Sequence, residues 1–182
     1  LTPISADEIQ TRIKETISDA KVVVRDYTGG GDHYEAVVVS EEFRGKPLVA
    51  RHRLVYGALQ EAMVERIHAL ALKTMTPDEL MKFLNSYLKF MSEPIRINHG
   101  FVDKFIGDAI MALFDHPEKE DSDEARDAVR SGLEMQRALV RYNEYREKHD
   151  YQEIKIGIGV HCGPVVIGTV GSENRMDSTV LG

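Results

Sequence analysis

The chain has 182 residues, of which 42% are hydrophobic and 29% charged, with a formal net charge of −7. This composition is typical of a soluble globular protein, and the length suffices for one ordinary domain or two small ones. The acidic balance argues against a nucleic-acid binder. No apolar run is long enough for a membrane segment and no signal peptide is evident, so the expected compartment is the cytoplasm. The single cysteine excludes an internal disulfide and a cluster held by four thiolates of this chain.

The first 77 residues predict a small unit of mixed helix and strand. Ser5 and Glu8 form a capping box at the start of a helix. The apolar positions of this helix recur every fourth residue, at Ile9, Ile13 and Ile17. A glycine loop at 29–31 separates two strands, because consecutive glycines weaken regular structure. The other expected elements are strands at 21–27, 33–39 and 67–73 and a helix at 48–66. This order predicts a compact α+β fold.

This half resembles the BolA family over nearly its whole length. The matching stretches are GGGDHYE from Gly29, FRGKPLV from Phe43, RHRLV from Arg51 and IHAL from Ile67. The resemblance implies a KH-like α+β fold and a partnership with a monothiol glutaredoxin and glutathione, with which the BolA member shares a [2Fe-2S] cluster. It also implies that this chain supplies imidazole, with His68 as the first candidate ligand and His33 as the second. Such ligation is chemically reasonable, because neutral imidazole binds iron and raises the cluster potential when it replaces thiolate.

The residues by themselves leave alternatives open in this half. His52 falls on the apolar side of the helix expected at 48–66, which favours a hydrogen-bonded core histidine over a ligand. His68 in a strand would also favour a structural role, and the family resemblance is what favours a ligand. A basic patch for nucleic acid, whose binding would fall steeply with salt, is a third alternative. It would be made by Arg44, Lys46, Arg51 and Arg53. Glu41 and Glu42 beside this patch favour a solvated charged face instead.

The residues from Thr76 onward predict a second unit. Thr76 and Glu79 form another capping box, with Pro77 suited to the first helical position. Gly107 and Asp108 fit a two-residue hairpin turn, since glycine tolerates positive φ at the first position. The helix after the capping box has an apolar face made by Leu80, Phe83, Leu84, Tyr87, Leu88, Met91 and Ile95. The other expected strands are at 101–106 and at 109–114, the latter buried on both faces, and a hairpin joins 154–161 with 165–170. A long helix is expected from 121 or 122, with an apolar side that includes Val129, Leu133, Leu139 and Val140.

From Leu80 onward the chain resembles the catalytic domain of class III nucleotide cyclases. The matching stretches are KFIGDAIMALF from Lys104, IGIGVHCGP from Ile156 and VGSENRMDSTV from Val170. The resemblance implies a ferredoxin-like core, a homodimer through this half, and conversion of ATP to cyclic AMP by attack of the ribose 3′ oxygen on the α-phosphate. Two metal ions, Mg²⁺ or Mn²⁺, assist that reaction. The resemblance places Asp108 at one of two metal-binding aspartates, and Lys104 and Thr179 at the two base-recognition positions, where lysine goes with adenine.

Groups that this reaction requires are missing from the expected positions. The place of the family's other metal-binding aspartate is taken by residues 67–75, which contain no carboxylate. In the family, an asparagine and an arginine that steady the reacting ribose and phosphate follow beyond the position of Gly182. Loss of one such stabilising group costs ~10²–10³ in rate. We therefore expect a truncated cyclase core that has no cyclase activity and binds ATP weakly or not at all.

The leading interpretation is an α+β chain of two domains, a BolA-like adapter at 1–77 and an incomplete cyclase core at 78–182. The alternatives are a fragment of a working adenylate cyclase that needs further segments, and a nucleic-acid-binding regulator. The strand expected at 67–73 has two places open to it. It either fills the vacancy left by the first strand of the cyclase sheet or remains in the sheet of the first half.

Overall fold

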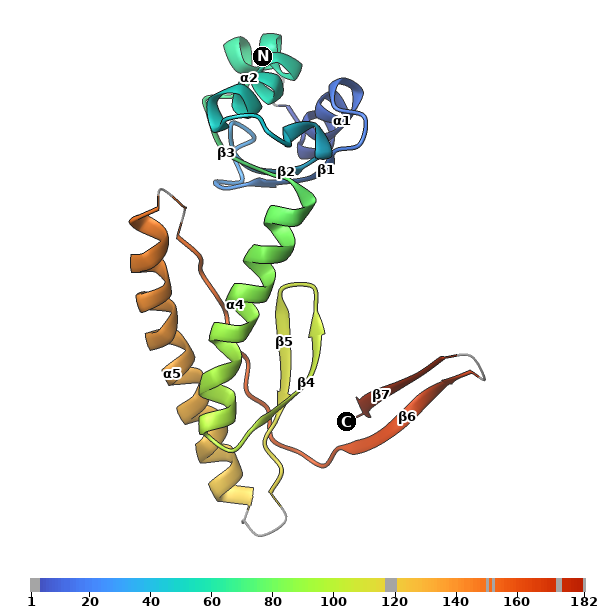
Figure 1. Ribbon diagram of the computed structural model, residues 1–182, viewed down its shortest axis with the longest axis vertical. Helices are drawn as coiled ribbons and strands as arrows, with labels where there is room; N and C mark the ends of the chain where they lie inside the picture. Colours follow the sequence, from blue (N-terminus) through green and yellow to red (C-terminus); the bar gives the residue numbers. More distant parts are fainter. Residues whose placement is uncertain (1–3, 117–120, 150, 152, 173–174, 182) are drawn as a thin grey trace. The chain divides into compact units, whose positions relative to one another are not determined.

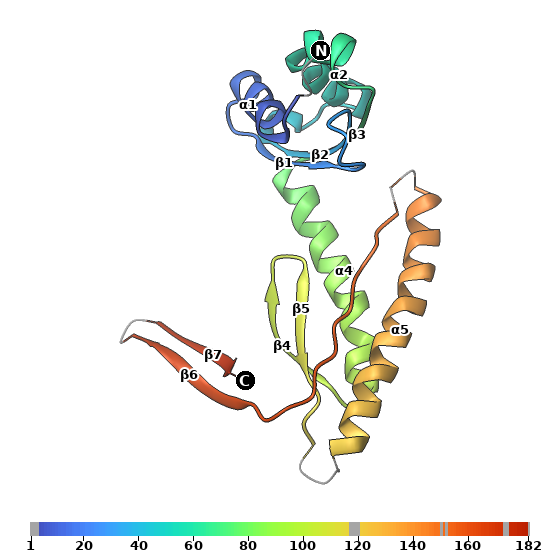
Figure 2. The ribbon, with the colours of Figure 1, turned by 180° about the vertical axis from the view of Figure 1, so that it is seen from behind.

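The computed structural model describes residues 4–116, 121–149, 151, 153–172 and 175–181 (Figures 1 and 2). Contacts between Cα atoms divide the chain into two compact units, Leu1–Phe83 (unit 1) and Leu84–Gly182 (unit 2). The division falls inside helix α4 (Pro77–Ile97), whose first turn holds the boundary predicted from the sequence. Both units combine helix and strand, which confirms the predicted fold class. No helix in the described part of the chain is both long and apolar enough to cross a bilayer.

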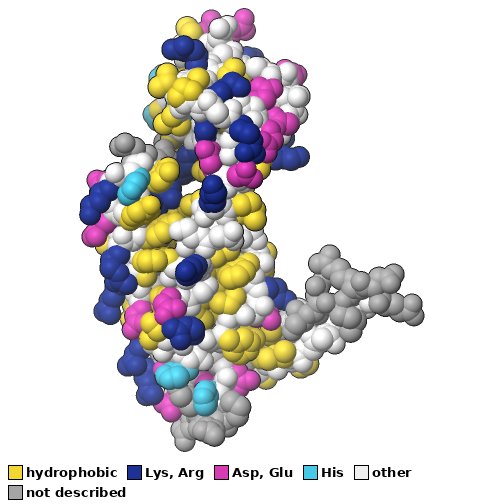
Figure 3. All heavy atoms as spheres, in the orientation of Figure 1, with side chains coloured by type: hydrophobic (Ala, Val, Ile, Leu, Met, Phe, Trp, Pro, Cys, Tyr) yellow, Lys and Arg dark blue, Asp and Glu magenta, His cyan; other side chains and the backbone are white. Residues whose placement is uncertain are grey.

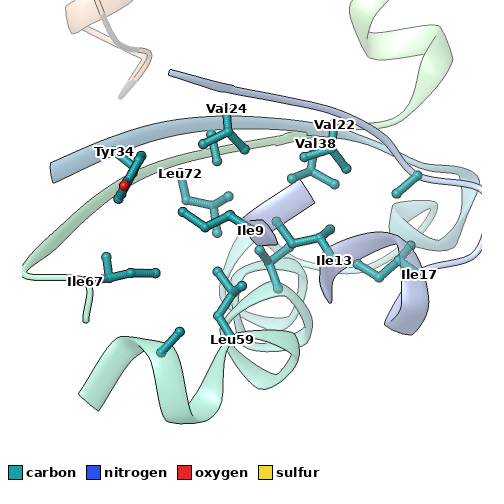
Figure 4. Close-up of a cluster of buried hydrophobic side chains, with 14 of the residues drawn as sticks. Ile9, Ile13, Ile17, Val22, Val24, Tyr34, Val38, Leu59, Ile67 and Leu72 are labelled. Atoms are coloured by element: carbon teal, nitrogen blue, oxygen red, sulfur yellow. The ribbon is translucent and has the colours of Figure 1, made fainter. Parts of the chain in front are cut away.

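Unit 1 is a three-stranded sheet with helices packed on one face (Figure 4). Its elements are α1 (Ala6–Thr16), β1 (Lys21–Asp26), β2 (His33–Val39), the 3-10 helix η1 (Glu41–Phe43), α2 (Leu48–Ala58), α3 (Gln60–Glu65) and β3 (Ala69–Met75). The strand order is β1-β2-β3, with β1 antiparallel and β3 parallel to β2. This arrangement brings the start of β2 next to the start of β3, where His33 pairs with Ala69.

The core of unit 1 follows from the isoleucine repeat of α1. The Ser5 hydroxyl accepts a hydrogen bond from the Glu8 N–H at 3.1 Å, so the helix begins where the capping box predicts. Figure 4 shows the apolar side chains of the helices and of the sheet pointing toward one another, among them Ile9, Ile13, Ile17, Leu59, Val22, Val24, Val38 and Leu72. The three isoleucines have no exposed surface, which confirms their predicted place in the core.

Two predicted elements of unit 1 differ in the structure. The single helix expected at 48–66 is broken at Leu59, a fully buried residue that ends α2 and precedes α3. The third strand begins at Ala69 and ends at Met75, later than predicted. Because β3 pairs in parallel with β2 along its whole length, the hypothesis that this segment completes the cyclase sheet is wrong. The strand remains in the sheet of unit 1.

The described residues of unit 2 form two long helices and two antiparallel strand pairs. Besides the main part of α4, its elements are β4 (Phe101–Ile106), β5 (Ala109–Leu113), α5 (Asp121–Glu147), β6 (Val166–Ser172) and β7 (Arg175–Leu181). Helix α5 lies beside α4 in both views (Figures 1 and 2), with the Phe90 and Tyr142 ring centroids 5.3 Å apart. The strands pair as β4 with β5 and β6 with β7, both antiparallel. Gly107 has φ of 63° in the turn before β5, as the predicted hairpin requires.

The strand predicted at 154–161 is wrong, because residues 153–165 form neither helix nor strand. The Asn143 side chain donates to the Ile154 carbonyl oxygen at 2.8 Å and accepts from the Ile154 N–H at 2.9 Å. Side chains of α5 therefore bind backbone groups that a strand ladder would use. The predicted pairing of 154–161 with 165–170 is consequently wrong as well, and β6 pairs with β7 instead.

The burial of β5 and of α5 also differs from the prediction. Strand β5 is partly exposed along its length rather than buried on both faces, because its sheet has two strands in the described part of the chain. Of the apolar side predicted for α5, Val129, Leu133 and Val140 are at least half exposed. Leu139 is buried as predicted, but the buried side of α5 also includes Ala138, Tyr142 and polar residues, a pattern that hydrophobic periodicity does not reveal.

The start of α4 is held by a complete capping box with an added arginine. The Thr76 hydroxyl accepts from the Glu79 N–H at 3.2 Å, and the Glu79 carboxylate accepts from the Thr76 N–H at 2.8 Å. Arg51 donates to both oxygens of that carboxylate, at 2.6 and 3.0 Å. These bonds, led by the one from Arg51, hold the pKa of Glu79 below its ordinary value of 4.5.

We expect Glu79→Gln to destabilise unit 1 more at neutral pH than at low pH. A lowered carboxyl pKa stabilises the fold above the ordinary value and is lost as the pH falls through the folded-state pKa. Because the Glu79 side chain is 46% exposed, screening limits the loss to about 0.5–1 kcal/mol at pH 7. Urea unfolding at pH 7 and at pH 3 measures the difference, with the exposed Glu61→Gln as control. An equal loss at both pH values would contradict this assignment.

Candidate functional site

The glycine loop of unit 1 is shaped by one carboxylate. Asp26, at the end of β1, accepts hydrogen bonds from the backbone N–H groups of Thr28, Gly29 and Gly31 at 3.0, 2.8 and 2.9 Å. Gly29 and Gly31 have φ of 73° and 76°, a region that favours glycine. The loop therefore holds Asp32, which directly precedes β2, in a defined position.

The structure brings the two predicted ligands, His33 and His68, together. His33 opens β2, and His68 directly precedes β3, where its N–H donates to the Asp32 carbonyl oxygen at 2.8 Å. The imidazole ring centroids are 6.2 Å apart and the ring planes differ by 9°. The side chains of His33 and His68 are 46% and 74% exposed. Parallel pairing of β2 with β3 thus creates a pair of accessible imidazoles.

Asp32 contacts both rings and was missed in the sequence interpretation. Its carboxylate lies 2.8 Å from His33 Nδ1 and 3.5 Å from His68 Nδ1. The hydrogen bond with His33 lowers the pKa of Asp32 against the opposing effect of burial. An ionised carboxylate only accepts, so it favours the tautomer with hydrogen on Nδ1 and leaves Nε2 as the metal-binding atom. The only signal for Asp32 in the sequence was its position directly before the candidate ligand His33.

No three histidine, cysteine, aspartate or glutamate side chains are grouped as a metal site among the residues that the structure describes. His52, expected to be a hydrogen-bonded core histidine, is half-buried on α2, and its Nε2 has no hydrogen-bond partner in that part of the chain. The prediction of a hydrogen bond there is therefore wrong. Burial lowers the pKa of His52, and its ring meets Tyr56 edge-on at 6.3 Å.

Two of the four residues of the predicted basic patch, Arg44 and Arg51, are engaged with carboxylates. Arg44 donates to Glu41 at 2.8 Å and to Asp78 at 2.9 Å, and Arg51 is bound to Glu79. On the face seen in Figure 3, acidic and basic side chains of unit 1 alternate rather than gather by sign. This distribution favours the solvated charged face over a surface for nucleic acid.

The two predicted base-recognition residues also meet. Lys104 Nζ, on β4, donates to Thr179 Oγ1, on β7, at 3.3 Å, although 75 residues separate them in the chain. A β-bulge lies between Val102 and Lys104. The residue in the bulge, Asp103, has a side chain only 5% exposed, with Oδ2 3.3 Å from Lys104 Nζ. The sequence interpretation did not identify Asp103, whose only local signal was its place beside Lys104.

The predicted metal ligand Asp108 lies apart from that contact. It is exposed at the β4–β5 turn and lines a cavity of about 620 Å³ together with Tyr87 and part of β5. Burial, with a further contribution from the charge of Asp108, raises the pKa of Tyr87. Lys104 and Thr179 are not among the residues that line this cavity. Asp108 also forms no group of three or more candidate ligands within the described ranges.

Comparison with protein families assigns the two halves. The sequence model of the family described as BolA-like protein matches residues 9–79, and that of the adenylate and guanylate cyclase catalytic domain matches residues 63–178. The chain belongs to both families. The matches overlap over 63–79, the segment that contains β3 and the start of α4. The fusion of a BolA-like domain with a cyclase catalytic domain, inferred from the sequence motifs, is confirmed.

Individual relatives match one half each. An adenylate cyclase of Anabaena cylindrica is 44% identical over 114 residues, which are 60% of this chain and 22% of that protein. The crystal structure of the guanylyl cyclase Cya2 is similar at 40% identity with a TM-score of 0.52, covering 58% of this chain and 53% of that one. A BolA protein homologue from Coxiella burnetii is 40% identical with a TM-score of 0.39, covering 43% of this chain and 97% of that one. The cyclase half thus resembles both a protein named adenylate cyclase and one named guanylyl cyclase. The chain covers only part of the length of each.

Proposed function

We propose that unit 1 is an adapter that supplies two imidazole ligands, His33 and His68, to a [2Fe-2S] cluster whose other ligands come from a monothiol glutaredoxin and glutathione. The observation that carries the proposal is the pair of parallel rings, 6.2 Å apart, with His33 Nδ1 hydrogen-bonded to the Asp32 carboxylate and His68 Nδ1 3.5 Å from it. A carboxylate behind a ligating histidine fixes the ring and increases its basicity. Two solvent-accessible imidazoles leave the remaining positions of a cluster to thiolates of a partner.

The three residues have two separate tasks in this proposal. His33 and His68 present Nε2 as the donor atom. Asp32 favours the tautomer with hydrogen on Nδ1 over the tautomer with hydrogen on Nε2, which could not bind iron through Nε2. The cluster, when bound, would supply one-electron chemistry at a potential raised by histidine ligation. The glycine loop held by Asp26 keeps Asp32 next to the start of β2. The pair therefore depends on the sheet of unit 1 and needs no other metal ligand from this chain.

The test is titration of a cluster-loaded monothiol glutaredoxin with the chain, followed by visible circular dichroism. We expect a changed spectrum with the wild type and no change with His33→Ala/His68→Ala. Asp32→Asn should weaken complex formation about 10–100-fold, as loss of a carboxylate behind metal-binding histidine does. His52→Asn, on α2 outside the pair, is the matched control and should behave as wild type. An unchanged spectrum with the wild type, or a full change with the double variant, would overturn the proposal.

A second function is supported by a different observation, the Lys104–Thr179 contact. We infer that unit 2 binds a purine nucleoside triphosphate weakly, with adenine near Lys104 and one Mg²⁺ or Mn²⁺ near Asp108, and does not cyclise it. Cyclisation by paired metal ions needs carboxylates for both ions. The segment in the place of the second metal-binding aspartate, β3, carries no carboxylate and belongs to the sheet of unit 1. A homodimer through unit 2 would join two copies that lack the same group.

Two measurements test the second function separately from the first. Isothermal titration with ATP and Mn²⁺ should give weak binding that Lys104→Met reduces. A cyclic AMP assay with Mn²⁺ should give no product above that of Asp108→Ala. Asp115→Ala, which changes another carboxylate that lines the same cavity, is the matched control. Cyclic AMP formation that disappears in Asp108→Ala would show an active cyclase and refute the proposed inactivity.

A further inference from the structure

Asp103 is a buried carboxylate without a full set of partners. Its side chain is 5% exposed, and its Oδ2 atom is buried with no hydrogen-bond partner in the described part of the chain. Burying a carboxylate in this way is costly unless a cation lies nearby. The ion-pair partner that the structure gives it is the Lys104 ammonium group, 3.3 Å from Oδ2.

The β-bulge explains how two consecutive residues of one strand can form this pair. In a regular strand the side chains of neighbouring residues point to opposite faces of the sheet. The register of β4 with β5 passes from Val102–Ala112 to Lys104–Met111, so Asp103 has no partner in β5. An extra residue of this kind bends the strand and turns its side chain. The bulge thereby allows the charged ends of Asp103 and Lys104 to meet on one side.

We propose that Asp103 is a positioning residue that fixes the Lys104 ammonium group against Thr179 Oγ1 and so makes the nucleotide site prefer adenine to guanine. The inference rests on the second proposed function. Adenine offers an acceptor at N1 next to donors at N6, whereas guanine offers a donor at N1 next to an acceptor at O6. A fixed ammonium donor beside a hydroxyl acceptor matches the order in adenine.

The fixed position is what produces the discrimination. A lysine ammonium group on its flexible stem can donate in many directions, so an unrestrained Lys104 would reach guanine O6 as readily as adenine N1. Restraint from two sides removes that freedom, since Asp103 lies at 3.3 Å and Thr179 at 3.3 Å from Nζ. A site with polar groups in a fixed order rejects the base whose own groups are in the reverse order.

A double-mutant cycle tests whether Asp103 acts through Lys104. The affinities of ATP and GTP are compared for wild type, Asp103→Asn, Lys104→Met and the double variant. We expect Asp103→Asn to weaken the binding of ATP on the order of tenfold, within the usual range of coupling between two contacting residues, and to change the binding of GTP much less. In the Lys104→Met background the same substitution should have no further effect. An equal effect of Asp103→Asn in both backgrounds would overturn the inference.

A matched control and a second readout separate this inference from the proposed function. Asp127→Asn changes another buried carboxylate of unit 2, one that contacts His99 on Nδ1 at 3.2 Å, and should leave the ATP-to-GTP ratio unchanged. A nuclear Overhauser effect between Lys104 Cε protons and the Thr179 methyl group needs no nucleotide. We expect it in wild type and Asp127→Asn and not in Asp103→Asn or Asp103→Ala. If the signal persists in both Asp103 variants, the inference is refuted. If the signal is lost in these variants but the wild type binds no nucleotide, only the proposed nucleotide-binding function is refuted.

Discussion

Replacing Ile13 by alanine is expected to lower the free energy of unfolding of unit 1 by about 2–5 kcal/mol. Ile13 is fully buried between the helices and the sheet, so the substitution removes apolar contacts and leaves a cavity. Urea unfolding measures the loss, and hydrogen exchange shows where it acts. Exchange should accelerate in β1, β2 and β3, and the proposed complex with glutaredoxin should weaken, because this sheet places His33 beside His68.

The matched control for Ile13→Ala is Val23→Ala. Val23 lies on the outer face of β1 and is 53% exposed, so its truncation removes little buried surface and should cost well under half as much. Equal losses for the two substitutions would contradict the assignment of the α1 isoleucines to the core. The comparison also tests the division of the chain, since amides of α5 in unit 2 should exchange as in the wild type.

Replacing Gly100 by alanine is expected to destabilise unit 2 by about 1–3 kcal/mol or more, as overpacking does. A β-carbon at this position would lie 2.5 Å from Phe114 Cε1 and 2.9 Å from Ile95 Cγ2. The Gly100 N–H donates to the Ile95 carbonyl oxygen at 2.9 Å and so ends α4 directly before β4. A thermal melt measures the loss of stability, and the Lys104–Thr179 contact reports any displacement of β4.

Gly157→Ala is the control for this second substitution. A β-carbon at Gly157 would meet nothing within 4 Å, so its effect should be small. If Gly100→Ala proves as stable as Gly157→Ala, the close packing of Gly100 against Phe114 is wrong. The pair separates steric cost from the general effect of adding a methyl group, because both residues belong to unit 2.

The amino-acid sequence by itself determined the helix N-caps, one hairpin turn and the family membership of both halves. The Ser5 hydroxyl caps its helix as predicted, although the Glu8 carboxylate binds Arg12 and Arg66 instead of completing the box. The capping box at Thr76 forms in full, and the turn at Gly107 adopts positive φ. These features depend on residues within four positions of one another, so a pattern in the sequence is sufficient. The BolA-like and cyclase motifs were likewise recognisable as short stretches. The candidate ligands His33 and His68 came from that resemblance, and their proximity followed from parallel pairing of β2 with β3.

Only the tertiary structure decided which distant segments pair and which charges are buried together. Strand β3 joins the sheet of unit 1, and Ile154 binds the side chain of Asn143 instead of a neighbouring strand. The roles of Asp32 and Asp103 likewise depend on partners and burial that neighbouring residue types do not specify. The physical reason is that strand pairing and the desolvation of a charge depend on groups far away in the chain. A local pattern records the tendency of a segment to be helix or strand, whereas packing selects its partner.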